Sequence, residues 1–275
     1  MTPGKTAILI LNRNLPGPTD SLCESFLYFE KSGQFDIFVI EAGSDIEKLS
    51  KFATWHVNTQ EVMNHGMRTC RGFNFGLKKL YDGGKFFNYD YFLTVTNDSV
   101  FDKKAILPIL IEEIEKHQKV GILSPCSRRW GEKNLLNVMN TRYFWYVHNT
   151  AYFLRRQFIE SVLNSKDELK FFFDGANFRG YGSDIEVIAK GYANDWATAI
   201  TSRVFVEENE SYLIEKSDYI KTEAYEENLL LCVKEGREWM KKKYGFTSRW
   251  QMQKYVQFWY DSFFDFHPEL ALFKI

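Results

Sequence analysis

Three apolar runs in the first hundred residues each end in polar side chains, and this feature constrains the fold more than any other. The runs and the residues that follow them are 6–11 before Asn12, 35–40 before Glu41, and 89–96 before Asn97. The first run is continuous, whereas the other two are mainly apolar and contain Asp36 and Asp90. Runs of this kind are typical of strands that are buried on both faces of a parallel sheet. The carboxyl ends of such strands meet at one edge of the sheet, so we expect these polar residues to face one crevice.

Segments with helical periodicity separate the strands. They include residues 67–81 and a segment that ends near Lys116. Farther along, we expect strands at 120–124, 142–149 and 196–206, and helices at 155–163 and 183–193. Strands that alternate with helices require right-handed crossovers, which give a mostly parallel sheet flanked by helices. The expected fold class is therefore α/β.

The last part of the chain has a different pattern. From Lys221 onward the sequence is mainly helical, and it contains no proline before Pro268. A chain of 275 residues can form one large core with a smaller appendage. We expect a main domain over residues 1–210 and a helical appendage over 211–275.

Aromatic residues make up 17% of the chain and are dense at 250–266. Such a segment can pack on the core, bury a face in a homodimer, or lie on a membrane surface. Packing on the core is the simplest interpretation. Peripheral membrane association and a homodimer stay open.

Charge and cysteine content narrow the class of protein. The formal net charge is -1, so no positive field favours nucleic acid as a partner. The four cysteines lie far apart, without the close pairs of zinc knuckles and redox dithiols. The apolar stretch 7–11 is too short for a signal-peptide core or a membrane span. These features favour a cytoplasmic protein, with the inner face of the membrane as an alternative location.

Several common catalytic motifs are missing. The first strand is followed by neither a Walker loop nor Gly-x-Gly-x-x-Gly. The sequence also lacks the Gly-x-Ser-x-Gly elbow and the His-Glu-x-x-His helix of hydrolases and metalloproteases. Three carboxylates at the ends of predicted strands or at a predicted helix start remain as candidates, namely Glu41, Asp98 and Asp184.

Four segments, in order, resemble family 2 glycosyltransferases of bacterial glycan assembly, which have the GT-A fold. Ile-Glu-Ala-Gly-Ser at 40–44 resembles their Val-Asp-Asn-Gly-Ser strand end, and Asn-Phe-Gly at 74–76 resembles their Asn-x-Gly segment. Asn-Asp-Ser at 97–99 is similar to their Asp-x-Asp or Asn-Asp-Asp motif. Gly-Ser-Asp at 182–184 falls where they keep a Glu-Asp pair. The resemblance covers roughly residues 6 to 210.

The resemblance implies an inverting glycosyltransferase that moves a sugar from a nucleotide-sugar donor to a hydroxyl group of a glycan or lipid-linked glycan. It implies that Asp184 is the general base, because a hydroxyl group is a poor nucleophile until a carboxylate takes its proton. The residues implied in donor binding are Asn12, Arg13, Glu41, Asn74, Asn97, Asp98 and Ser99. Asn12 and Glu41 would contact the base and ribose, and Asp98 would hold any divalent metal at the diphosphate.

Two positions depart from the family pattern. Ser99 stands where the last carboxylate of the motif is expected, and Glu207 and Glu208 occupy a stretch where many relatives have a metal-binding histidine. A requirement for Mg²⁺ or Mn²⁺ is therefore open. Asp98 and Asp184 also fit a simpler role as helix caps.

Two other functions stay open. A sugar-phosphate nucleotidyltransferase shares the sheet architecture. A protein that binds sugar nucleotides or glycans without catalysis fits the incomplete metal motif.

Overall fold

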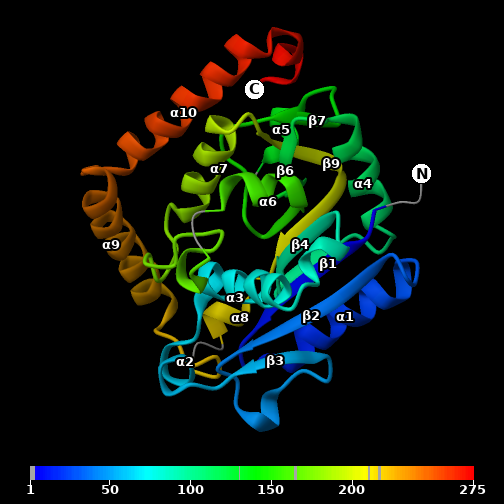
Figure 1. Cartoon of the computed structure of the whole chain (residues 1–275). Coiled ribbons are helices and arrows are strands. Elements are labelled where there is room, and N and C mark those ends of the chain that lie inside the picture. Colours follow the sequence, from blue (N-terminus) through cyan, green and yellow to red (C-terminus); the bar gives the residue numbers. More distant parts are fainter. Residues whose placement is uncertain (1–3, 130, 164–165, 210, 216–217) are drawn as a thin grey trace.

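The computed structural model describes residues 4–129, 131–163, 166–209, 211–215 and 218–275. Its strands are β1 (Thr6–Asn12), β2 (Phe35–Ala42), β3 (Ala53–Val57), β4 (Tyr91–Thr96), β5 (Ser99–Phe101), β6 (Val120–Cys126), β7 (Thr141–Tyr143), β8 (Ala151–Arg155) and β9 (Ala197–Glu208). They form one sheet in the order β3-β2-β1-β4-β8-β6-β9-β5, and β7 pairs with β9. Figure 1 shows this sheet at the centre of the molecule, with helices around it.

The helices follow the order of the strands. They are α1 (Pro16–Phe29), α2 (Gln60–His65), α3 (Arg68–Asp82), α4 (Leu107–Lys116), α5 (Glu132–Leu136), α6 (Arg156–Val162), α7 (Ser183–Ala193), α8 (Ser211–Glu215), α9 (Tyr225–Tyr244) and α10 (Arg249–Phe266). Short 3₁₀ turns lie at Ile46–Lys48, Phe86–Asn88, Glu168–Lys170 and Pro268–Phe273. The expected helices at 67–81, 155–163 and 183–193 are confirmed.

The parallel part of the sheet aligns the strand ends that the sequence marks with polar residues. Strands β3, β2, β1 and β4 all run parallel, and Asn12 pairs in register with Glu41. Leu11 pairs with Thr96, which places the end of β4 beside the end of β1. The three strand ends therefore meet at one edge, as the sequence predicts.

Strand β8 breaks the parallel arrangement. It runs antiparallel between β4 and β6, while β6 and β9 are again parallel. The expected strand at 142–149 is wrong in extent, since β7 ends at Tyr143 and the next strand begins only at Ala151. The apolar residues between them include Trp145 and Tyr146, which line a cavity instead of a sheet face.

Helix α3 approaches the sheet closely because it carries two glycines one turn apart. A Cβ atom on Gly72 would collide with Leu11 of β1, and one on Gly76 would collide with Ile40 of β2. The missing side chains let the helix backbone lie directly against these two strands. The beginning of α3 is thereby held next to the aligned strand ends.

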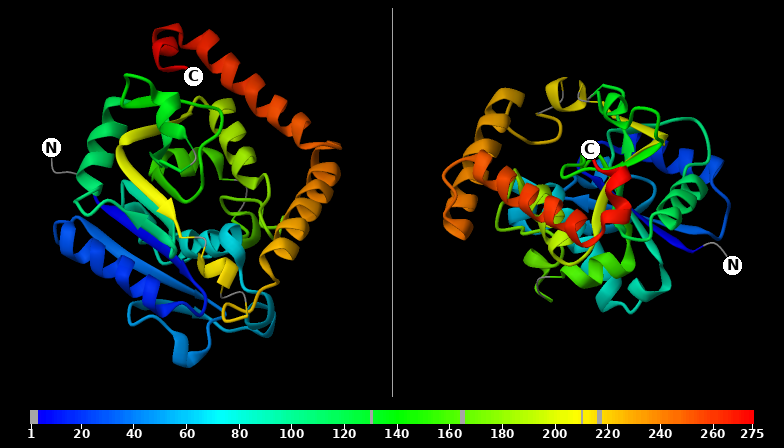
Figure 2. Two further views of the ribbon diagram at one scale, coloured as in Figure 1. Left: turned by 180° about the vertical axis from the view of Figure 1, so that it is seen from behind. Right: turned by 90° about the horizontal axis from the view of Figure 1, so that it is seen from above.

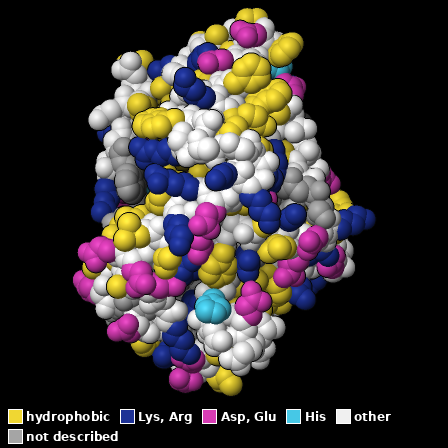
Figure 3. Space-filling model, turned by 90° about the vertical axis from the view of Figure 1, so that its left-hand side faces the viewer, with side chains coloured by type: hydrophobic (Ala, Val, Ile, Leu, Met, Phe, Trp, Pro, Cys, Tyr) yellow, Lys and Arg dark blue, Asp and Glu magenta, His cyan; other side chains and the backbone are white. Residues whose placement is uncertain are grey.

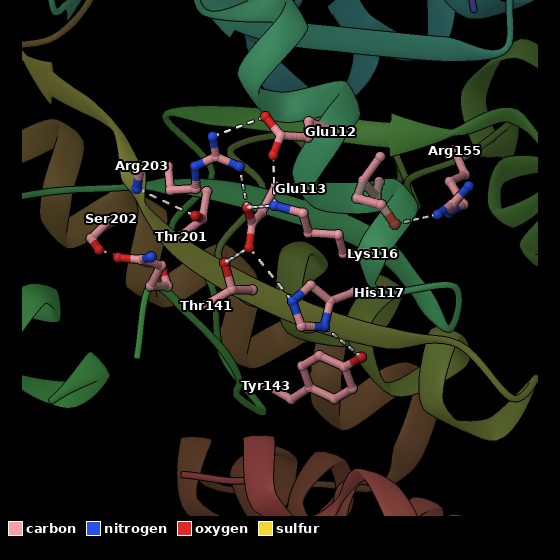
Figure 4. A network of polar contacts seen from close by, with 12 residues as sticks. Glu112, Glu113, Lys116, His117, Thr141, Tyr143, Arg155, Thr201, Ser202 and Arg203 are labelled. Carbon is pink, nitrogen blue, oxygen red and sulfur yellow. Dashed lines mark hydrogen bonds and ion pairs between the residues drawn. The ribbon is translucent and has the colours of Figure 1, made fainter. Parts of the chain in front are cut away.

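A polar network fastens α4 to the far part of the sheet (Figure 4). Buried Glu113 accepts a hydrogen bond from Thr141 Oγ1 at 2.8 Å, and its Oε2 lies 2.8 Å from Arg203 Nη1. His117 Nε2 lies 3.6 Å from Glu113 Oε1, and His117 Nδ1 lies 3.2 Å from the hydroxyl of Tyr143. Burial lowers the pKa of His117, and the nearby Glu113 only partly offsets this effect.

The C-terminal helices pack on the core, which confirms the simplest interpretation of the aromatic segment. Figure 2 shows α9 and α10 forming an elbow along one side of the molecule. The ring centroid of Tyr260 on α10 lies 5.3 Å from that of Tyr192 on α7, and both rings belong to the central hydrophobic cluster. The division into two domains at residue 210 stays a prediction, and that residue lies outside the described ones.

The outer surface of the elbow is mixed in character. Trp250, Phe258 and Phe266 are largely exposed, yet Asp261 and Asp265 are exposed on the same helix. On the side that includes α9, cationic and hydrophobic side chains lie next to one another (Figure 3). Within the described ranges, every helix is too short or too polar to span a bilayer. Membrane association and a homodimer remain predictions.

Candidate functional site

A buried carboxylate organises the edge where the strand ends meet. Glu41 is fully buried, and it accepts hydrogen bonds from Asn12 Nδ2 at 2.8 Å, Ser44 Oγ at 2.5 Å and the backbone N–H of Ser50 at 2.9 Å. These bonds fix the loop after β2 against the end of β1. Three of the roughly four acceptor positions of a carboxylate are filled in this way.

Asn97 extends this arrangement to the end of β4. Its Nδ2 donates to Asn12 Oδ1 at 2.9 Å and to Thr19 Oγ1 at 3.1 Å. Asn97, Asn12 and Glu41 therefore form one continuous chain of hydrogen bonds across three strand ends. The sequence marks these residues as neighbours, and the structure brings them together.

A cavity of about 160 Å³ opens beside this chain, and we call it the strand-end pocket. Arg13, Arg68 and Asn97 line it together with Ala42 and Thr222. Burial and the neighbouring charge of Arg68 lower the pKa of Arg13 to about 10, so its guanidinium is still protonated at neutral pH. Two cations beside a small cavity suit an anionic ligand such as a phosphate group.

Residues 218–223 close one side of the strand-end pocket, and we call them the roof segment. The carbonyl of Tyr219 accepts a hydrogen bond from Asn14 Nδ2 at 3.0 Å. Arg68 Nη2 lies 2.9 Å from Glu223 Oε2, which ties the end of the roof segment to the start of α3. Sequence reasoning missed this segment, because it lies 154 to 205 positions from Asn14 and Arg68, which it contacts.

Asn74 lies away from the strand-end pocket. Its fully buried side chain donates to the carbonyls of Leu169 and Phe173 at 3.1 and 2.8 Å. Its Oδ1 accepts the backbone N–H groups of Phe172 and Phe173 at 3.0 and 2.8 Å. In the structure this amide therefore holds the 169–173 segment against α3, and the sequence resemblance gave no signal of that role.

Asp98 and Ser99 lie opposite the end of β9. Ser99 pairs in register with Glu208, and the backbone N–H of Asn209 donates to the carbonyl of Asp98 at 2.9 Å. The Ser99 hydroxyl is buried and donates to the carbonyl of Thr150 at 3.3 Å. The β5–β9 pairing thus brings the backbones of Asp98 and Glu208 close together. Among the described residues, no three Asp, Glu, His or Cys side chains converge on one point.

Asp184 lines a cavity of about 510 Å³, which we call the Asp184 cavity. The side chain belongs to the first turn of α7, whose N-cap is Gly182, and its Oδ1 accepts the backbone N–H of Ile185 at 2.9 Å. Burial raises the pKa of Asp184, while that hydrogen bond and the charge of His148 limit the rise. The residue is therefore a half-buried carboxylate with an increased proton affinity.

Aromatic side chains supply much of the wall of the Asp184 cavity. Trp145 and Tyr146 come from the loop before β8, Tyr181 precedes α7, and Trp250 comes from α10. The flat apolar faces of such rings, with few polar groups between them, are typical of sites for organic ligands. The sequence does not predict this wall because its members come from distant segments.

An ionic link connects the two cavities. Arg68 lines the strand-end pocket and Arg179 lines the Asp184 cavity, and both pair with the carboxylate of Glu223. Burial acts to raise the pKa of Glu223, but hydrogen bonds and the two arginine charges lower it to about 2. Arg179 also pairs with Glu235 of α9. The carboxylate of Glu223 is thus ionised over the whole physiological range.

Comparisons with known proteins bear on the fold. No family model matches the sequence, and no match is found among curated proteins. Among solved structures, GalNAc-T7 with UDP, GalNAc and Mn²⁺ aligns with a TM-score of 0.56 and 10% identity, over 75% of this chain and 44% of that one. Residues 1–349 of TarS from S. aureus align with a TM-score of 0.51 and 12% identity, over 87% and 73% of the two chains. The chain has the GT-A fold.

The expected fold is therefore confirmed. The sequence identities are low, so the structural similarity supports the fold and not the activity. The chain also spans only 44% of the longer TarS chain, as it does of GalNAc-T7. A shared fold does not determine the activity, which depends on the chain's own residues.

Proposed function

We propose that the protein is an inverting glycosyltransferase that moves a sugar from a nucleotide-sugar donor to a hydroxyl group of a glycan or lipid-linked glycan. The observation that carries the proposal is the position of Asp184. Its carboxylate has a raised pKa and lines a large, aromatic-walled cavity. An ionic link joins this cavity to a second, cationic pocket at the strand ends.

The donor is assigned to the strand-end pocket and its surroundings. Asn12 and Glu41 shape the side where the base and ribose would bind, and Arg13 and Asn97 line the pocket itself. The GT-A structure of GalNAc-T7 contains UDP, which supports a nucleotide as the ligand. The Asn97–Ser99 turn follows β4 at the end assigned to the diphosphate.

Catalysis requires one proton transfer and one displacement. Asp184 takes the proton of the acceptor hydroxyl, whose oxygen then forms a bond to the anomeric carbon of the donor sugar. The bond from that carbon to the diphosphate oxygen breaks, and the nucleoside diphosphate leaves with the electron pair. Attack from the face opposite the leaving group inverts the anomeric centre. The raised pKa of Asp184 makes it a stronger base than an ordinary aspartate.

Asp98 and Glu208 would hold a divalent metal, and by themselves they do not form a complete site. The side chains of Asp98 and Glu208 carry the hard oxygen atoms that Mg²⁺ and Mn²⁺ prefer, and Mn²⁺ is present with UDP in the GalNAc-T7 structure. Oxygen atoms from the diphosphate would have to complete the coordination, because the described residues hold no third ligand of this kind nearby. Such a metal supplies positive charge that stabilises the leaving diphosphate.

The proposal is tested by following sugar transfer and donor binding separately. A panel of sugar nucleotides, each with and without Mn²⁺, is screened for an increase in melting temperature. A ligand at 100 times its dissociation constant stabilises a protein by about 2.7 kcal/mol, which such an assay detects readily. The stabilising donor is then incubated with saccharide acceptors, and released nucleoside diphosphate is measured for the wild type and for Asp184→Asn.

Three outcomes separate the competing functions. Release of nucleoside diphosphate by the wild type, with loss of turnover but not of the melting shift in Asp184→Asn, supports the glycosyltransferase. Release of pyrophosphate from a nucleoside triphosphate and a sugar phosphate supports a nucleotidyltransferase. Stabilisation without turnover under every metal condition supports a binding protein.

A further inference from the structure

The turn of the elbow, between α9 and α10, places two side chains at the Asp184 cavity. Gly245 ends α9 with a φ of 72°, a left-handed conformation that favours glycine. Ser248 then begins α10 with a capping box, in which Gln251 completes the reciprocal hydrogen bonds. The first two residues of α10 are Arg249 and Trp250, and both line the cavity.

Arg249 differs from the other arginine of the cavity in its charge balance. Arg179 is held by the carboxylates of Glu223 and Glu235, so its charge is neutralised. Arg249 forms no ion pair with any described carboxylate, and its guanidinium lies 4.8 Å from the ring centroid of Trp250. Stacking on the indole positions the guanidinium while its N–H groups stay available.

No carboxylate that lines the cavity among the described residues pairs with Arg249. Among the described residues that line it, Asp184 is the one carboxylate, and it makes no ion pair with Arg249. The two side chains come from the first turns of different helices, α7 and α10. One cavity therefore combines a base, an aromatic wall and a separate, available cation.

We infer that the elbow is the acceptor-recognition element, and that Arg249 and Trp250 select an acceptor saccharide with an acidic substituent, either a carboxylate or a phosphate. The sugar ring stacks on Trp250, and the acidic group receives charge-assisted hydrogen bonds from Arg249. The acceptor hydroxyl then lies in the same cavity as Asp184. The assignment of an acceptor rests on the proposed function, but the binding of acidic saccharides can be measured without it.

The experiment compares matched saccharides by ligand-observed NMR titration of the whole protein. Methyl glucoside is the neutral parent, methyl glucuronide is the carboxylate arm, and glucose 6-phosphate with free glucose is the phosphate arm. The variants are Arg249→Gln and Trp250→Ala. Their matched controls are Lys254→Gln and Phe258→Ala, which change exposed residues of the same helix outside the cavity.

In the wild type we expect at least one acidic saccharide to bind about tenfold more tightly than its neutral partner, the effect of one charge-assisted contact. Arg249→Gln should abolish this preference, Trp250→Ala should weaken the binding of acidic and neutral sugars alike, and both controls should behave as wild type. Equal affinity for acidic and neutral sugars in the wild type, no binding of any sugar, or an undiminished preference in Arg249→Gln would overturn the inference.

The outcome is separable from that of the proposed function. If acidic saccharides bind through Arg249 but no nucleotide sugar supports transfer, the recognition site stands and the glycosyltransferase assignment fails. If transfer occurs with the same efficiency to neutral and acidic acceptors in both the wild type and Arg249→Gln, the assignment stands and the inference fails.

Discussion

Asn12 Nδ2 lies 2.8 Å from Glu41 Oε2, and this hydrogen bond joins the ends of β1 and β2 at the position where the two strands pair in register. The carboxylate is fully buried, so the hydrogen-bond donors around it replace the water that it lacks. The same amide group of Asn12 accepts a hydrogen bond from Asn97 through its oxygen. A single side chain thus orients the ends of three strands.

Glu41→Ala should destabilise the protein strongly. The change leaves the amide of Asn12, the hydroxyl of Ser44 and the N–H of Ser50 without their acceptor. Losing buried hydrogen bonds to a charged group should lower the free energy of unfolding by about 3 kcal/mol or more. Urea denaturation measures the change. Glu47→Ala, at an exposed position nearby, is the control and should remain within about 0.5 kcal/mol of wild type.

Asn74→Ala should lower the stability of the protein and leave the affinity for the donor nucleotide unchanged. Four backbone groups of the 169–173 segment lose their partner, so we expect a loss of about 2–4 kcal/mol in unfolding free energy. Nucleotide affinity, measured by calorimetry well below the melting temperature, should stay within about twofold of wild type. Asn64→Ala on the exposed side of α2 controls for loss of an amide. Weakened nucleotide binding with unchanged stability would instead give Asn74 the donor contact that the family resemblance implies.

Asp184→Asn should raise stability while it removes transfer. The pKa of Asp184 is higher in the folded than in the unfolded chain, so the folded state binds the proton more tightly. Folding stability contributed by this group therefore falls as the pH rises from the ordinary value of 3.8 through the folded pKa. The Asn variant lacks this loss and keeps the acceptor for the N–H of Ile185.

The measurement for Asp184 is a pair of pH profiles. The melting temperature of Asp184→Asn should exceed that of wild type at pH 7, and the difference should shrink as the pH approaches 4. Transfer by the wild type should decline on the acid side as the carboxylate is protonated, with a midpoint above 3.8. Turnover of the variant should fall by about 100-fold or more. Near-normal turnover would remove Asp184 from the role of base.

Burial of His117 should make the protein less stable in weak acid. Its pKa in the folded chain lies below 6.5, so the unfolded chain takes up a proton first as the pH falls. Stability should therefore decrease as the pH drops from about 6.5 toward the folded pKa. Glu113 raises the pKa of His117 and Lys116 lowers it. The pKa of Glu113 is itself lowered, so its own contribution to stability is lost only at lower pH.

The test for His117 is the slope of stability against pH between 7 and 5. His117→Gln should flatten that slope, because the side chain no longer takes up a proton. His65→Gln, at an exposed position on α2, should keep the wild-type slope. An unchanged slope in His117→Gln would show that other groups control acid stability.

The strand-end part of the site could be predicted from sequence for a local reason. Mainly apolar runs identify buried strands, and the polar residue that ends each run marks the ligand edge of the sheet. Asn12, Glu41 and Asn97 meet as expected because helical crossovers make these strands parallel and so bring their carboxyl ends to one edge. The prediction of Asp184 rests on its place at the start of a predicted helix together with the family resemblance.

The remaining parts depend on contacts between distant segments. Strand β8 pairs antiparallel with β4 and β6, and no local sequence pattern predicts the strands with which a short strand pairs. The sequence pattern around Trp145 and Tyr146 predicts a strand, because periodicity does not distinguish a residue on a sheet face from one in a cavity wall. Asn74 belongs to a segment that resembles a family motif. In the folded chain its side chain forms hydrogen bonds with the backbone of Phe173, a contact that the sequence does not predict.

The shared carboxylate of Glu223 makes the two cavities thermodynamically dependent on each other. Arg68 and Arg179 divide one negative charge, so an anion that draws Arg68 toward the strand-end pocket leaves more of that charge to Arg179 at the Asp184 cavity. If a ligand in one cavity changes the binding free energy of a ligand in the other, the second ligand changes the binding free energy of the first by the same amount. Occupancy of either cavity therefore changes the electrostatic environment of the other, so the ligand affinities of the two cavities are linked.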